Sequence, residues 1–146
     1  MLDMVKIYNN VILWLTGGIV YFYMEIAFRG YSHFSMLICG GVCFVTVGYV
    51  GRKILAHSKN VLVALPKIMV SGMLIITFYE FVTGVLVNKV LRWNVWDYSE
   101  QRYNVMGQIC LVYSLLWSML SLLCVYLDII IRKYIFDEVP VKANQT

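Results

Sequence analysis

The sequence predicts an all-α membrane protein, a four-transmembrane-helix bundle that forms a single membrane domain over residues 1–146. The composition favours this class, because 61% of the residues are hydrophobic and 14% are charged, whereas soluble domains average about 45–50% apolar and about 25% charged residues. The pattern agrees, since the hydrophobic residues fall into four long runs, and the mean hydropathy is +0.75. The apolar surplus is therefore expected to face lipid.

Each of the four runs is read as one membrane crossing. The crossings are expected at about residues 7–28, 34–50, 61–87 and 105–131. A transmembrane helix needs roughly 20 mainly apolar residues, and an open sheet edge would leave backbone groups unpaired in hydrocarbon. The second run is the shortest and is rich in glycine, which favours close packing against a neighbouring helix. The fourth is long enough to tilt.

The basic residues predict the orientation. If both termini and the segment between the second and third runs share one side, that side carries Lys6, Arg52, Lys53, Lys59, Lys67, Arg132, Lys133 and Lys142. The other side carries Arg29, Lys89, Arg92 and Arg102. Because the side richer in lysine and arginine is normally cytoplasmic, we expect both termini in the cytoplasm and a multi-pass protein of the cell (cytoplasmic) membrane.

The stretch from Glu80 to Gln108 is the most unusual part of the chain, because it places polar residues among and between apolar runs. A carboxylate at the bilayer centre costs about 2.5–3.5 kcal/mol on insertion scales, so intramembrane acids are commonly functional. The first run carries a second glutamate, Glu25, and Arg29 lies one helical turn further on, within pairing distance. The candidate ion- or ligand-binding residues are Glu25, Arg29, Glu80, Asn88, Asp97, Tyr98, Asn104 and Gln108.

The two glutamates have two interpretations, which the sequence leaves open. In the first, the glutamates connect helices through hydrogen bonds to hydroxyl groups or rings. In the second, they form a site near the outer leaflet for an ion, a proton or a polar headgroup. Small and polar residues recur on one face of the first, third and fourth runs, which indicates that these faces meet inside the bundle. Trp93, Trp96, Tyr98 and Tyr103 are placed at the outer membrane interface, where amphipathic rings prefer to lie.

Other kinds of site receive little support from the sequence. The four cysteines lie inside apolar runs without a CxxC or Cys/His pattern, so we expect buried small side chains rather than a disulfide framework or a metal site. No cofactor is expected and no catalytic residue is assigned, because the chain has no Ser/His/Asp set and no thiolate paired with histidine. The net charge of +4 is attributed to membrane orientation, so no nucleic-acid partner is expected.

Two segments carry a resemblance to a known family. Residues 79–99 (YEFVTGVLVNKVLRWNVWDYS) and 104–117 (NVMGQICLVYSLLW) resemble the CmpB-like permeases, the family named ABC-transporter type IV. The matching positions are Glu80, Phe81, Thr83 and Gly84, then Trp96, Asp97, Tyr98 and Ser99, then Gly107, Gln108, Ile109 and Cys110. The resemblance covers about residues 17–132, is looser in the N-terminal half, and leaves the role of Arg29 open. It implies membrane transport.

The sequence therefore favours a small transporter or permease-like protein that acts in the lipid bilayer as a homodimer or another homo-oligomer. The chain has no Walker A pattern, so an ATPase that drives transport would be a separate protein. Two alternatives stay open. One is a membrane-embedded lipid-modifying enzyme with Glu80 or Asp97 as general base. The other is a non-transporting accessory subunit bound to a larger membrane partner.

Overall fold

The computed structural model describes residues 2–138 and the side chains of residues 4–138. Its main elements are α1 (Leu2–Arg29), α2 (Phe34–His57), α3 (Val61–Gly84), the π-helical continuation of α3 named η1 (Val85–Val90), and α4 (Leu111–Tyr134). A short antiparallel pair, β1 (Asn104–Val105) and β2 (Ile109–Cys110), precedes α4. Within the described residues, four helices are long and apolar enough to cross a membrane, which confirms the predicted all-α, four-span class.

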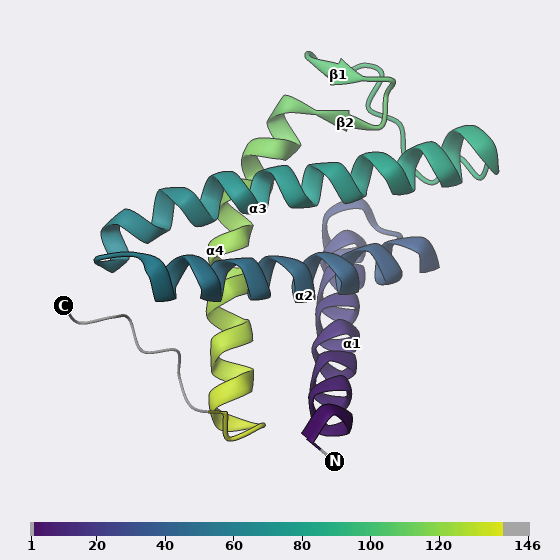
Figure 1. Ribbon diagram of the computed structural model, residues 1–146. Helices are drawn as coiled ribbons and strands as arrows, with labels where there is room; N and C mark the ends of the chain where they lie inside the picture. The colour runs from purple at the N-terminus through teal and green to yellow at the C-terminus, as the bar shows by residue number, and fades with distance from the viewer. Residues whose placement is uncertain (1, 139–146) are drawn as a thin grey trace.

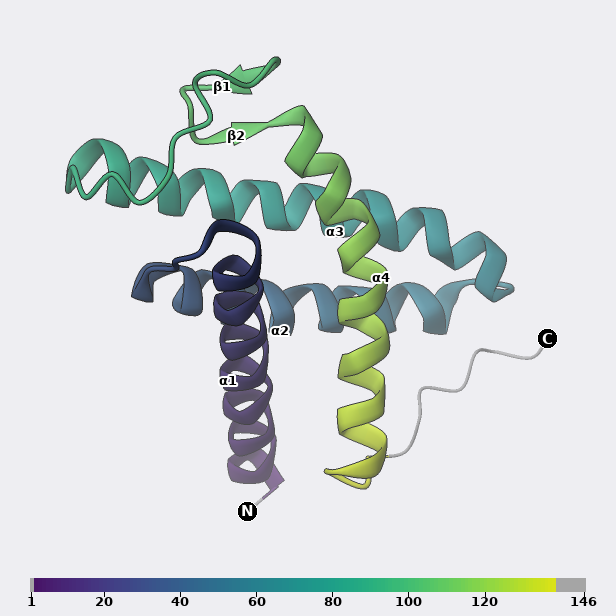
Figure 2. The same cartoon turned by 180° about the vertical axis from the view of Figure 1, so that it is seen from behind.

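The four helices form two crossed pairs. Figure 1 shows α2 and α3 side by side and antiparallel, with α4 running steeply across both and α1 running steeply across α2. Figure 2 shows the reverse side, where α4 lies in front of both helices and α1 lies in front of α2. Helix α1 packs mainly on α2, and α4 packs on both α2 and α3, whereas α1 and α4 contact each other only sparsely. The space between α1 and α4 is therefore bounded by α2 and α3.

Glycine residues stand where the helices approach most closely. A Cβ atom added to Gly17 would overlap the side chain of Phe44, and one added to Gly72 would overlap Ser121. Without a hydrophobic drive between helices in lipid, small residues allow the backbones to come close enough for dispersion forces and hydrogen bonds. The small residues of the helix faces are thus packing positions, as the sequence indicated.

The ends of α1, α2 and α4 differ from the sequence expectation, and α1 begins at Leu2 rather than near residue 7. Helix α2 continues to His57 rather than ending near residue 50, because polar residues can prolong a helix beyond hydrocarbon. Helix α4 begins at Leu111 rather than near Val105. Gly107 has a φ of 72°, and the β1–β2 pair keeps the chain extended to Cys110. Residues 91–110 consequently form a cap segment that covers one end of the bundle (Figure 1).

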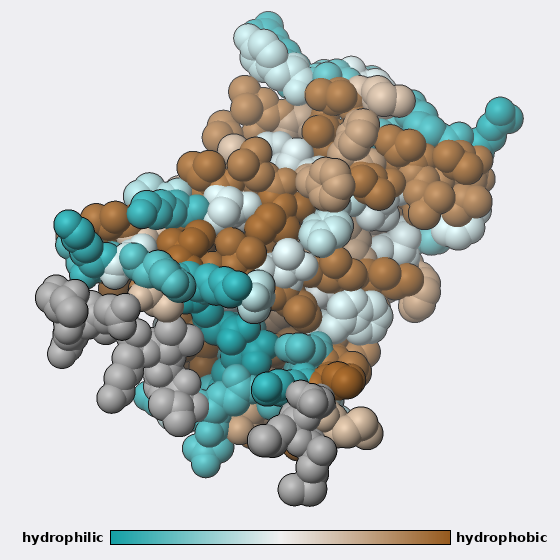
Figure 3. Space-filling model, viewed as in Figure 1, coloured by the Kyte–Doolittle hydropathy of each residue, from teal (hydrophilic) through white to brown (hydrophobic). Residues whose placement is uncertain are grey.

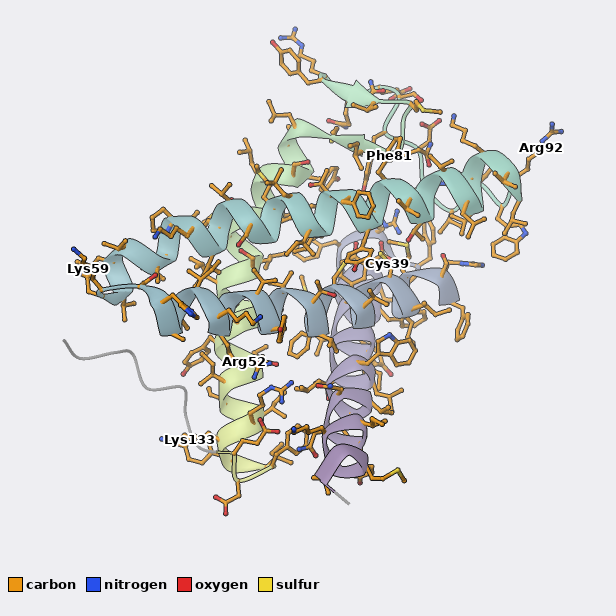
Figure 4. The ribbon with its side chains drawn as sticks, viewed as in Figure 1. Cys39, Arg52, Lys59, Phe81, Arg92 and Lys133 are labelled. Carbon is orange, nitrogen blue, oxygen red and sulfur yellow. The ribbon has the colours of Figure 1, made fainter. Side chains whose placement is uncertain are left out.

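Charged residues gather at two sides of the molecule. Asn9 of α1 donates to Glu138 at 3.0 Å, so the start of α1 lies beside the end of α4. Hydrophilic surface extends from these ends to the α2–α3 turn, and hydrophilic residues also appear at the outer edge of the cap segment, among hydrophobic ones (Figure 3). In Figure 4, Arg52, Lys59 and Lys133 lie on the first side and Arg92 lies far from them. This is the predicted grouping; that its side is cytoplasmic stays a prediction, and Lys142 lies outside the described residues.

Replacing Gly72 with valine is expected to destabilise the fold by about 1–3 kcal/mol, because the new side chain overlaps Ser121 of α4 and overpacks the α3–α4 crossing. Thermal unfolding of the purified protein in detergent measures the effect. The matched control is Leu74→Val, two residues along α3, since Leu74 is exposed to the lipid side. An equal loss of stability in both variants would contradict the role given to Gly72.

Candidate functional site

A buried carboxylate on α3 joins three separate elements. Glu80 is only 2% exposed. Its Oε2 atom accepts a hydrogen bond of 2.8 Å from Nε1 of Trp117 on α4, and its Oε1 atom accepts one of 3.1 Å from the hydroxyl of Tyr98 in the cap segment. Among the side chains that the structure describes, no lysine, arginine or histidine forms an ion pair with Glu80.

Aromatic rings surround this carboxylate. Tyr98 stacks on Tyr113 with ring centroids 4.7 Å apart and planes inclined by 21°. Tyr113 in turn lies 6.4 Å from Trp117, and Tyr21 of α1 approaches Trp117 to 5.8 Å. The rings bring α1, α4 and the cap segment around Glu80 and remove water from it. Electrostatic interactions of the carboxylate are therefore stronger here than in water.

Glu80 lies at the wall of a cavity of about 90 Å³ between the four helices. The lining is apolar apart from a few polar atoms, and it comprises Gly17, Val20, Tyr21, Met24, Cys39, Gly40, Cys43, Phe44, Ile76, Glu80, Trp117, Leu120, Leu123, Cys124 and Leu127. Figure 4 labels Cys39 where α2 faces α3. All three lining cysteines are free thiols. Glu80 is the one carboxylate among the lining residues, so the cavity is apolar with a single acidic side chain.

Glu25 has partners of its own outside this cavity. Its Oε1 atom is 2.5 Å from Nη2 of Arg29, and its Oε2 atom accepts a hydrogen bond of 2.6 Å from Ser32. Arg29 also lies 5.1 Å from the centre of the Tyr31 ring, a cation–π arrangement. The structure therefore brings Glu25 and Arg29 together, as their spacing predicted, but neither lines the cavity with Glu80.

Asn88 and Gln108 fasten the cap segment to α3. Both are buried, and Nδ2 of Asn88 donates to Oε1 of Gln108 at 2.8 Å. The Oδ1 atom of Asn88 accepts from the backbone N–H of Val95 at 2.7 Å. The backbone carbonyl of Gln108 accepts from Nε1 of Trp96 at 3.0 Å, and its side-chain Nε2 donates to the carbonyl of Met106. These amides are engaged in holding the chain in place.

Asp97 and Asn104 shape the cap segment itself. The exposed Asp97 accepts from the backbone N–H of Ser99 at 2.9 Å and from its hydroxyl at 2.5 Å. These two bonds, the hydroxyl bond first, lower the pKa of Asp97. Asn104 donates to the carbonyls of Ser99 and Gln101 and accepts from the N–H of Gly107 at 3.0 Å. The WDYS segment thereby holds Tyr98 over Glu80.

A second buried acid lies at the opposite end of the bundle, and the list of candidate site residues did not include it. Asp128 of α4 is fully buried, 2.7 Å from Nε of Arg52 on α2 and 3.2 Å from Nε of Arg132. Arg132 also pairs with Glu138 at 3.0 Å and donates to Asn10 of α1 at 2.9 Å. This group, the Asp128 cluster, joins α1, α2 and α4. The spacing of Asp128 and Arg132 signals one pair, but the contact with Arg52 depends on how the helices cross.

Substituting Asn88 with alanine should loosen the cap segment, because it leaves the N–H of Val95 and the side-chain oxygen of Gln108 without their partners. Each buried unpaired group costs about 1–3 kcal/mol. Hydrogen exchange of the backbone amides of residues 91–110 should become faster. The exposed residue Glu100 provides the control, since its side chain makes no hydrogen bond to the other described residues. Unchanged exchange in the Asn88 variant would show that these bonds do not fasten the cap.

Replacing Asp128 with asparagine is expected to lower the free energy of unfolding by about 3–5 kcal/mol, because two arginines lose the buried anion that balances them. Chemical or thermal unfolding in detergent tests this. Asp137→Asn is the matched control, because Asp137 is exposed. If both variants unfold at the wild-type midpoint, the Asp128 cluster does not stabilise the meeting of α1, α2 and α4.

Comparison with known proteins places the chain in a family. Neither the curated proteins nor the solved structures contain a match to the chain. One family model, described as "Putative ABC-transporter type IV", matches residues 13–145, which is nearly the whole chain and includes Glu25, Glu80 and Asp128. The chain is thus a multi-pass membrane protein that belongs to the ABC-transporter type IV family.

Proposed function

We propose that the chain is a small permease in which Glu80 binds the transported cation or proton. The observation that carries the proposal is that Glu80 is buried without a cationic partner among the described side chains. Glu25 is paired with Arg29, and Asp128 is paired with two arginines, whereas Glu80 has no cationic partner among the described side chains. A carboxylate buried in this way is costly unless it takes up a proton or meets a cation.

The surroundings of Glu80 favour a small monovalent guest. The two hydrogen bonds from Trp117 and Tyr98 hold the carboxylate oxygens in fixed positions. Tyr21 and Trp117 line the same cavity, and aromatic rings can attract cations over their faces. A volume of about 90 Å³ limits the guest to a proton with water, a small inorganic cation, or the head of a small organic one.

The cap segment is suited to act as the gate of this site. Tyr98 reaches Glu80 with one hydrogen bond and is only partly buried. A guest that arrives from the cap side has to displace the Tyr98 hydroxyl, which costs a modest amount of free energy compared with unfolding a helix. Burial and the neighbouring Glu80 charge also raise the pKa of Tyr98, so it remains a hydrogen-bond donor at neutral pH.

The proposal also includes a separate ATPase as the energy source and a homo-oligomer as the assembly. The family name supports a link to ABC transport, and the chain itself carries no Walker A pattern. A separate ATPase would then supply the energy. A homodimer or another homo-oligomer would enlarge the path that four helices alone enclose, and the sparse contact between α1 and α4 leaves room for such rearrangement.

The proposal predicts that Glu80→Gln removes most transport while the fold persists. The amide keeps the shape of the side chain but loses the negative charge that attracts the guest. Flux through proteoliposomes that contain the purified chain should fall by at least about tenfold, since a bond to a charged group contributes about 1.5–3 kcal/mol. The transported species to be tested are protons, Na⁺, K⁺ and methylammonium, each driven by a concentration gradient.

Glu100→Gln is the control, because it removes the same charge from an exposed cap residue. Equal flux in wild type and Glu80→Gln would rule out Glu80 as the binding carboxylate. Absence of flux in the wild type, with the native unfolding midpoint, would favour the accessory-subunit alternative if a stoichiometric membrane partner co-purifies. Turnover of added lipid that is lost with Glu80→Gln would instead favour the lipid-modifying enzyme.

A further inference from the structure

A basic hollow lies beside the α2–α3 turn, away from the Glu80 cavity. It measures about 280 Å³, and its lining comprises Val50, Lys53, Ile54, His57, Ser58 and Lys67. Three of these residues are basic types, and none is acidic. The α2–α3 turn beside it belongs to the hydrophilic side of the molecule that carries Arg52, Lys59 and Lys133 (Figures 3 and 4).

The two lysines of the hollow lack anionic partners. Across residues 4–138, neither Lys53 nor Lys67 forms an ion pair. Lys53 has its ammonium 4.6 Å from the centre of the Tyr49 ring, which leaves its charge uncompensated. The nearby arginine, Arg52, is already paired with Asp128. The hollow thus holds two positive charges that attract an anion.

The position of Lys67 makes an anion from the membrane more fitting than one from solution. Lys67 stands inside α3, within the stretch of that helix apolar enough to span a membrane. A lysine at such a place carries its ammonium towards the headgroup region. Val50 and Ile54 line the same hollow and offer apolar contacts to a chain. An occupant with an anionic head and an apolar tail satisfies both parts.

We infer that this hollow binds the headgroup of an anionic phospholipid, with Lys53 and Lys67 on the phosphate. Basic pockets between transmembrane helices bind such headgroups, and a lysine near the membrane surface contributes about fivefold in affinity. The side of the molecule is also the one that the charge distribution predicts to be cytoplasmic, where the leaflet is anionic. This site shares no lining residue with the Glu80 cavity, so the inference about lipid binding does not depend on the proposal about transport.

The test compares two lipids on the full-length chain in a mild, uncharged detergent. Dioleoylphosphatidylglycerol and dioleoylphosphatidylcholine are added separately, and native mass spectrometry counts bound lipid while the unfolding midpoint is followed. Phosphatidylglycerol is expected to bind more tightly and to raise the midpoint more. The double variant Lys53→Gln/Lys67→Gln should lose roughly fivefold in phosphatidylglycerol affinity for each lysine.

The matched control is Lys89→Gln/Arg102→Gln, which removes two positive charges from the cap side and should keep the preference. Both lysines of the hollow are exposed, so the double variant should fold, and the single variants repeat the test if it does not. Equal affinity for the two lipids, or the same loss in the control, overturns the inference. Displacement of the lipid by an equal concentration of inorganic phosphate also overturns it, because the hollow would then be a site for the free ion.

Discussion

The arrangement of α3, α4 and the cap segment depends on one set of hydrogen bonds. The carboxylate of Glu80 accepts them from the indole of Trp117 and the hydroxyl of Tyr98. It connects α3 to α4 within the bundle and α3 to the cap segment above it. In water these bonds would compete with solvent and contribute little. In an apolar bundle they have no such competitor, so the position of the cap segment and the position of α4 are both tied to one acidic side chain.

The two buried acids at opposite ends of the bundle, Glu80 and Asp128, have different partners. Asp128 is neutralised by Arg52 and Arg132, and the resulting cluster locks α1, α2 and α4 together. Glu80 receives hydrogen bonds from the neutral donors Tyr98 and Trp117, and in the proposed function a proton or a transported cation balances it. Between these ends, glycines such as Gly17 and Gly72 let the helices approach.

Hydropathy predicted the four helices well, because each crossing must satisfy its own backbone in lipid. It placed the start of α4 too early, since residues 105–110 are as apolar as a helix, and the positive φ of Gly107 leaves no mark on hydropathy. Within the site, the pairing of Glu25 with Arg29 followed from their spacing along one helix. Glu80 and Tyr98 were both candidates, but Trp117 was not, because a tryptophan in an apolar run looks the same whether it faces lipid or a carboxylate. Asn88 and Gln108 were also candidates, and the sequence did not show their hydrogen-bond partners, because these follow from the fold of the cap segment.

The most direct test is nuclear magnetic resonance of the indole N–H groups in the ¹⁵N-labelled chain, which has four tryptophans. With Glu80 intact, the Trp117 indole should resonate as a group bonded to a carboxylate and exchange slowly with water. Changing Glu80 to glutamine should shift that resonance strongly and leave Trp14, on the far part of α1, in place. A Trp117 signal that exchanges quickly and ignores the substitution would mean that the carboxylate does not hold the helices and the cap segment together.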